Sequence, residues 1–150
     1  MERPRIRSES ARAATAGGDV PERGETIRTL TQLVGQALAD QDEADAAIRA
    51  CGVTGTVSDD TAVRLGEMLR SYSRLYYAAE AVQPGAEADL VEARRDLLEL
   101  LSYHLHMLRD AGDLVFSGRD VPRNARFRRE LAEGLGPRAA DLTRLLVHLA

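Results

Sequence analysis

The sequence predicts an all-α protein: an antiparallel bundle of three long helices plus a C-terminal helix, preceded by a disordered N-terminal tail. Two observations support this fold class. Apolar residues make up 44% of the chain but aromatic residues only 4%, and the Leu, Ala and Val that dominate them suit helices better than sheets. Apolar residues also recur at three- and four-residue steps through long stretches, which places them on one face of a helix.

The N-terminal segment differs from the rest of the 150-residue chain. Residues 1–20 have no apolar period, and the part from Ser8 to Val20 is rich in Ser, Ala, Gly and Thr. Such a segment cannot offset its ordering entropy by burial. We therefore expect residues 1–20 to be a flexible tail and residues 21–150 to form one helical bundle domain.

The first helix is expected over residues 21–51. Pro21 suits a first helical turn, and Gly52 stands where a left-handed C-cap is favoured. The predicted apolar face consists of Ile27, Leu30, Val34, Ala37, Leu38, Ala44 and Ile48.

The second helix should begin after Ser58, a good N-cap residue, and end before Pro84. Its apolar face consists of Leu65, Met68, Leu69, Tyr72, Leu75, Tyr76, Ala79 and Val82. The third helix is expected over residues 86–111, with Gly112 ending it. Its apolar face consists of Leu90, Leu97, Leu98, Leu101, His104, Leu105 and Leu108.

Residues 112–124 are expected to be irregular, followed by a short helix over 125–133 and a last helix starting at Pro137. The short links imply that neighbouring helices are antiparallel. Four leucines line the last helix: Leu142, Leu145, Leu146 and Leu149. They can complete the bundle or pack against a second copy, and the sequence leaves both open.

Composition excludes several chemistries. All 20 basic residues are Arg, so there is no P-loop lysine and no lysine Schiff base. The single cysteine, Cys51, permits no intramolecular disulfide and is expected to be a small buried residue. The Glu-x-x-His pattern of di-iron bundles is missing because Ser102 stands three residues after Glu99. We expect no metal and no cofactor.

An arginine-rich segment is the densest charged feature. Residues 119–129 contain five Arg and one acid, and arginine pairs bidentately with phosphate or carboxylate. The candidate residues for binding a polyanion or partner are Arg119, Arg123, Arg126, Phe127, Arg128 and Arg129. Alternatively, these arginines pair with the acidic middle of the same chain, since residues 17–116 carry nine Arg and 18 acids.

Aromatic and titratable side chains suggest a possible pocket between helices, formed by Tyr72, Tyr76, Glu99, Tyr103 and His106. Helical spacing favours Tyr72 and Tyr76 as core residues with wet hydroxyls over a ligand-binding role. His104 falls on the apolar face of its helix and is expected to be a hydrogen-bonded core residue.

The leading hypothesis for function is a protein–protein interaction or self-assembling module, binding another protein or a second copy of itself, without catalytic activity of its own. The first alternative is nucleic-acid or other polyanion binding through residues 119–129, and the second is a small-molecule or catalytic site between helices. The chain has no apolar run of 18 or more residues and no apolar segment after its N-terminal arginines. We therefore expect no membrane span and a cytoplasmic location.

Overall fold

The computed structural model describes residues 21–53, 57–117 and 122–150, and every regular element within them is a helix. The predicted tail, residues 1–20, lies outside this range. The elements in chain order are α1 (Arg23–Gly52), α2 (Asp59–Ala81), α3 (Ala88–Ser117), α4 (Pro122–Ala132), the 3-10 helix η1 (Gly136–Arg138) and α5 (Ala139–Leu149).

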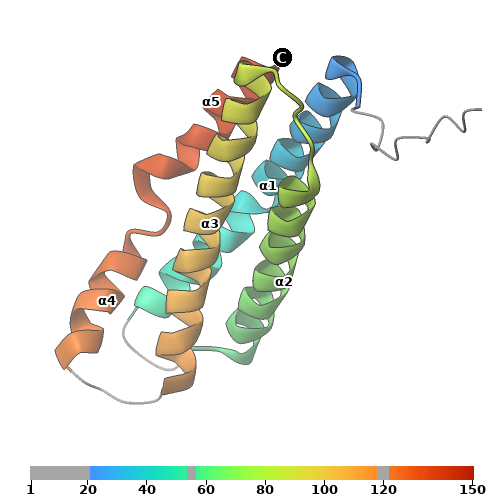
Figure 1. Cartoon of the computed structure of the whole chain (residues 1–150). Coiled ribbons are helices and arrows are strands. Elements are labelled where there is room, and N and C mark those ends of the chain that lie inside the picture. Colours follow the sequence, from blue (N-terminus) through green and yellow to red (C-terminus); the bar gives the residue numbers. More distant parts are fainter. Residues whose placement is uncertain (1–20, 54–56, 118–121) are drawn as a thin grey trace, which may run out of the picture.

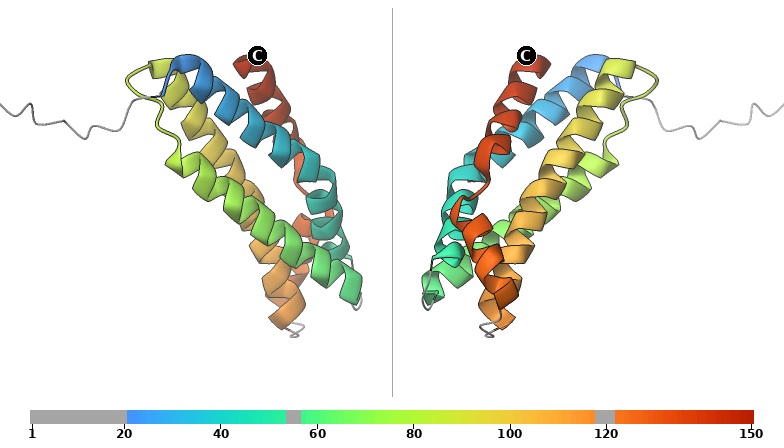
Figure 2. Two further views of the ribbon diagram at one scale, coloured as in Figure 1. Left: turned by 90° about the vertical axis from the view of Figure 1, so that its right-hand side faces the viewer. Right: turned by 90° about the vertical axis from the view of Figure 1, so that its left-hand side faces the viewer.

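The helices form an antiparallel bundle, as predicted (Figure 1). α1, α2 and α3 alternate in direction, and α4, η1 and α5 together return along α3 in the fourth position. α1 packs against each of the other α-helices, while α2 packs mainly on α1 and α3. The two side views show α5 returning to the end of the bundle where α1 begins (Figure 2).

The core is built from the apolar faces that the sequence periodicity predicts. Most of the buried apolar side chains are leucine, and each α-helix with described side chains contributes at least one leucine. The largest apolar ones are Tyr72, Leu30, Ile48, Leu65, Leu97, Leu101, Leu108, Leu131, Leu135 and Leu142. Cys51 is also buried, as expected, and its burial raises the pKa of the thiol.

Both ends of α2 are satisfied by side chains. At the N-terminus, the Ser58 hydroxyl accepts a hydrogen bond from the backbone N–H of Thr61 at 3.2 Å, which confirms the predicted cap. At the C-terminus, Arg94 of α3 donates to the carbonyls of Ala79 (3.2 Å) and Glu80 (2.7 Å). A cation here also compensates the negative end of the helix dipole.

Replacing Arg94 with methionine is expected to lower the free energy of unfolding by about 1–2 kcal/mol, because the carbonyls at the end of α2 lose a charged donor. The matched control is Arg95→Met. Arg95 is exposed and lies 3.5 Å from Glu92, so the control should change stability by less than about 0.5 kcal/mol. Urea denaturation of both variants tests this; equal effects would contradict the capping role.

The third helix continues past Gly112, so the predicted end there is wrong. α3 runs to Ser117, and α4 already begins at Pro122. Most of the segment predicted to be irregular is therefore helical. The extension is favoured because Leu114 and Val115 pack against the hydrophobic core, while Gly112 itself is buried within the helix.

The prediction of a left-handed cap at Gly52 is also wrong. Gly52 is the last residue of α1, and it is not among the glycines with positive φ. It is instead needed for a close helix approach. A Cβ built on Gly52 would overlap the backbone nitrogen of Ala132 and would lie 2.7 Å from the carbonyl oxygen of Arg128. α1 and α4 therefore cross with almost no space between their backbones.

Two left-handed glycines separate α4 from α5. Gly134 has φ of 66° and Gly136 has φ of 64°, a conformation that favours glycine. Asp45 of α1 holds this turn, since its Oδ1 accepts a hydrogen bond from the backbone N–H of Leu135 at 2.8 Å. Its Oδ2 accepts from Arg49 at 2.7 Å. Asp45 thus attaches the turn between α4 and α5 to α1.

The last helix completes this bundle. Leu142, Leu145 and Leu149 are buried against the other helices and Leu146 is half-buried. Of the two outcomes that the sequence left open for this leucine face, the fold uses it within the chain. Any further contact of α5 must therefore involve its polar side.

Candidate functional site

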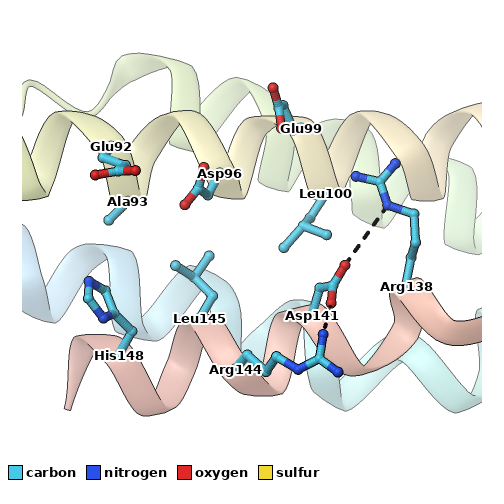
Figure 3. Close-up of a pocket in the computed structure, with 10 residues that line it drawn as sticks. All are labelled: Glu92, Ala93, Asp96, Glu99, Leu100, Arg138, Asp141, Arg144, Leu145 and His148. Carbon is cyan, nitrogen blue, oxygen red and sulfur yellow. Dashed lines mark hydrogen bonds and ion pairs between the residues drawn. The ribbon is translucent and has the colours of Figure 1, made fainter.

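A groove of about 530 Å³ runs between α3 and α5 (Figure 3). The two helices pack less extensively against each other than each packs on α1, so the space between their outer flanks remains open. The residues that line the groove are Glu92, Ala93, Asp96, Glu99, Leu100, Arg138, Asp141, Arg144, Leu145 and His148.

Helical spacing gives each wall of the groove one row of charged side chains. On α3, Glu92, Asp96 and Glu99 are four and three residues apart and share one flank; we call them the acidic row. On the other wall, Arg144 and His148 are four residues apart on α5, and Arg138 precedes them in η1; we call these three residues the basic row. Figure 3 shows Glu92 opposite His148 at one end and Arg138 toward the other.

The floor of the groove is apolar. Ala93 and Leu100 of α3 and Leu145 of α5 lie beneath the two rows, and each is buried. An apolar floor with charged walls is the arrangement found in protein interfaces, where a desolvated centre is surrounded by a polar rim.

The charges of the groove pair within each wall and not across it. Asp141 lies 2.5 Å from Arg144 and 3.9 Å from Arg138, and so neutralises part of the basic row. Arg95 lies 3.5 Å from Glu92 and 3.9 Å from Asp96. Among these described residues, no ion pair connects the acidic row to the basic row. Two walls of opposite sign therefore border the same open groove, with Glu92 and Asp96 near α5 and Glu99 pointing away from it (Figure 3).

A second, shallower groove of about 670 Å³ continues from the first across the outer face of α3. It is lined by Tyr76, Arg95, Leu98, Glu99, Ser102, Tyr103, His106 and Arg138, and shares Glu99 and Arg138 with the first groove. Four of the five residues predicted to form a pocket thus come together here: Tyr76, Glu99, Tyr103 and His106.

Tyr72, the fifth predicted pocket residue, lies elsewhere. Its side chain is fully buried, and its hydroxyl donates to the carbonyl of Ala37 at 2.7 Å. The ring stacks on His104 with centroids 5.0 Å apart. Burial, with a smaller effect of Asp40, raises the pKa of the phenol. Tyr72 is a core residue because its position on α2 faces inward between Met68 and Leu75.

A buried hydrogen-bond network below the grooves connects α1, α3 and α5. His104 Nδ1 lies 2.7 Å from the carbonyl oxygen of Leu100, which makes it the donor. Nε2 is then the acceptor, and Gln41 Nε2 lies 3.0 Å from it. The Gln41 amide also donates to the carbonyl of Ala139 at 3.0 Å. His104 is therefore a hydrogen-bonded core residue, as predicted, and burial lowers its pKa.

Tyr103 positions the end of the basic row. Its hydroxyl donates to the carbonyl of Leu135 at 2.7 Å, and the Arg138 guanidinium carbon lies 4.8 Å from the centre of its ring. This cation–π contact holds Arg138 at the border of the two grooves. Burial raises the pKa of Tyr103, and the nearby Arg138 opposes that shift.

The residues of the predicted arginine-rich segment whose side chains the structure describes line neither groove. Arg119 is outside the described residues, and of Arg123 only its place in α4 is described. Arg126 is exposed and lies 3.3 Å from Glu130, Phe127 and Arg128 are half-buried, and Arg129 is exposed. Polyanion binding by this segment stays a prediction.

The sequence reasoning missed the basic row. Arg144 and His148 stand four residues apart, but only the packing of η1 and α5 beside α3 places them and Arg138 opposite the acidic row. The described residues also contain no cluster of three or more His, Cys, Asp or Glu that could hold a metal ion. Within the same part of the chain, no helix has the length and apolar character needed to cross a membrane.

Comparison with known proteins adds no further evidence on function. No protein-family model, no curated protein and no solved structure matches the chain.

Proposed function

We propose that this protein is a helical protein–protein interaction module, without catalytic activity of its own, that binds helices of its partner along the groove between α3 and α5. One observation carries the proposal: the acidic and basic rows face each other over an apolar floor without pairing across it. Charged groups arranged in this way select and orient a partner with complementary charges.

The character of the groove favours a protein partner over a small molecule. Sites for small molecules are mostly apolar and bury most of the ligand, whereas seven of the ten residues that line this groove are charged or titratable. An amphipathic helix suits the groove better. Its apolar face would contact the floor, and basic and acidic side chains on its two flanks would pair with the two rows.

A synthetic amphipathic peptide tests the proposal. Its helix carries one apolar stripe flanked by arginines on one side and glutamates on the other, and it is labelled for fluorescence anisotropy. We expect this two-signed peptide to bind, and peptides with arginine on both flanks or glutamate on both flanks to bind about tenfold more weakly or less. Equal binding of all three peptides would contradict the proposal.

Protein variants provide the matched control. Glu92→Arg with Asp96→Arg removes half of the complementarity and should abolish discrimination between the peptides. Asp42→Arg with Glu43→Arg makes the same change in charge on exposed positions of α1 outside the groove and should leave binding unchanged. Equal loss of binding in both variants would indicate attraction by net charge alone.

A further inference from the structure

We infer that the partner of the α3–α5 groove is a second copy of this chain, docked face to face about a twofold axis that runs along the groove. This inference rests on the proposed function and specifies its partner, whose own α3 and α5 supply the helices that meet the two rows. It follows from the placement of the two charged rows and from the symmetry of dimers.

Most homodimers are built around a twofold axis, so that one surface patch contacts the same patch on the partner. A twofold axis along the groove exchanges its two walls. The acidic row of one copy (Glu92, Asp96 and Glu99) then faces the basic row of its partner, and the reverse contact forms at the same time. An axis perpendicular to the groove would instead place like-charged rows together, which is unfavourable.

The residues at one end of the groove suggest the register of this dimer. Glu92 lies opposite His148 within one copy (Figure 3). The twofold operation therefore places Glu92 of one copy against the basic row of the other copy, at the end of that row where His148 lies.

The two rows offer a charge-exchange experiment. One variant, with Glu92→Arg and Asp96→Arg, makes both walls basic. A second, with Arg144→Glu and His148→Glu, makes both walls acidic. Arg138 is left in place because Tyr103 and Asp141 hold it. Sedimentation velocity over a range of protein concentrations measures association, and far-UV circular dichroism checks that each variant is folded.

We expect the native chain to sediment as a dimer, and each variant alone to dissociate with a dissociation constant raised about tenfold or more. An equimolar mixture of the two variants should regain the dimer, because one copy now supplies two basic walls and the other two acidic walls. A chain carrying all four substitutions should also dimerise, since the charges at these four positions are exchanged between its walls. The Asp42→Arg, Glu43→Arg control should remain dimeric.

Three results would overturn the inference: a monomeric native chain at all concentrations, reversal variants that remain dimeric, or a mixture that fails to reassociate. These outcomes are separable from a failure of the proposed function. A monomeric chain that still binds the two-signed peptide would retain the groove as a binding site and lose only the second copy as its partner.

Discussion

Replacing Gly52 with alanine is expected to lower the free energy of unfolding by about 2–3 kcal/mol. The added methyl group would overlap the backbone of Ala132 and approach the carbonyl oxygen of Arg128 to 2.7 Å. Neither atom belongs to a flexible side chain that could turn away. α4 must therefore move off α1, and the contacts of Leu131 with the core would be strained or lost.

Gly35 provides a control in the same helix. A Cβ at Gly35 meets no other atom within 4 Å, and alanine is a better helix former than glycine by about 0.5–1 kcal/mol. Gly35→Ala should therefore stabilise the protein, while Gly52→Ala destabilises it. Urea denaturation followed by circular dichroism gives both values. A stabilising effect at both positions would mean that α1 and α4 do not approach closely.

Replacing His104 with alanine should have an effect of similar size, a loss of about 3 kcal/mol in the free energy of unfolding. The change creates a cavity beside Tyr72. It also removes the acceptor of one hydrogen bond from the Gln41 amide, whose other partner is the Ala139 carbonyl. His106 is the matched control, since it lies two residues further along α3 and is exposed. His106→Ala should change stability by less than about 0.5 kcal/mol.

His104 should also make stability depend on pH. Desolvation by burial lowers the pKa of His104 below its ordinary value of 6.5; Arg138 adds to this shift, while the Leu100 carbonyl and Asp45 oppose it. The unfolded chain therefore takes up a proton at this site at a higher pH than the folded chain. As a result, the free energy of unfolding should be fully maintained above pH 6.5 and should decrease as pH falls below it.

The slope from this one site is at most about 1.4 kcal/mol per pH unit. Urea denaturation between pH 8 and pH 5, a range of about three units around the histidine value, measures how the free energy of unfolding depends on pH. Comparing the native protein with a His104→Leu variant isolates the contribution of His104. The variant should have a smaller slope through the region just below pH 6.5. Identical slopes in the two proteins would contradict a neutral buried His104.

In α2, local sequence patterns predicted where the helix begins, where it ends and which face is buried. Ser58 caps its first turn, Pro84 follows its end, and the residues between them alternate between inward and outward faces at helical spacing. All of these effects act within a few residues along the chain. The same is true of His104, whose position on an apolar face predicts burial.

Glycine shows where local signals fail. Gly52 and Gly112 both resemble helix ends, yet Gly52 permits the crossing of α1 and α4, and Gly112 lies inside α3. Glycine ends a helix only when nothing beyond it favours continuation. At Gly112 the helix continues because Leu114 and Val115 pack against the core. Other helices form part of that core, so the local sequence does not reveal it.

The candidate groove, too, could be predicted from the sequence only in part. The acidic row on α3 could be recognised from the spacing of Glu92, Asp96 and Glu99, but neither its partner row nor the apolar floor could. Tyr72 and Tyr76, which the sequence treats alike, also separate in the structure: one enters the core and the other lines the outer groove. Their difference depends on which side of α2 faces α1 and α3.

The sequence by itself determined that the chain folds into amphipathic helices and which side of each helix is apolar, because periodicity and capping depend on neighbours three or four residues away. Only the tertiary structure decided which helices lie side by side. It thereby set the close approach at Gly52, the burial of Tyr72 and the facing rows of opposite charge. These depend on contacts between residues far apart in the chain, which no local pattern specifies.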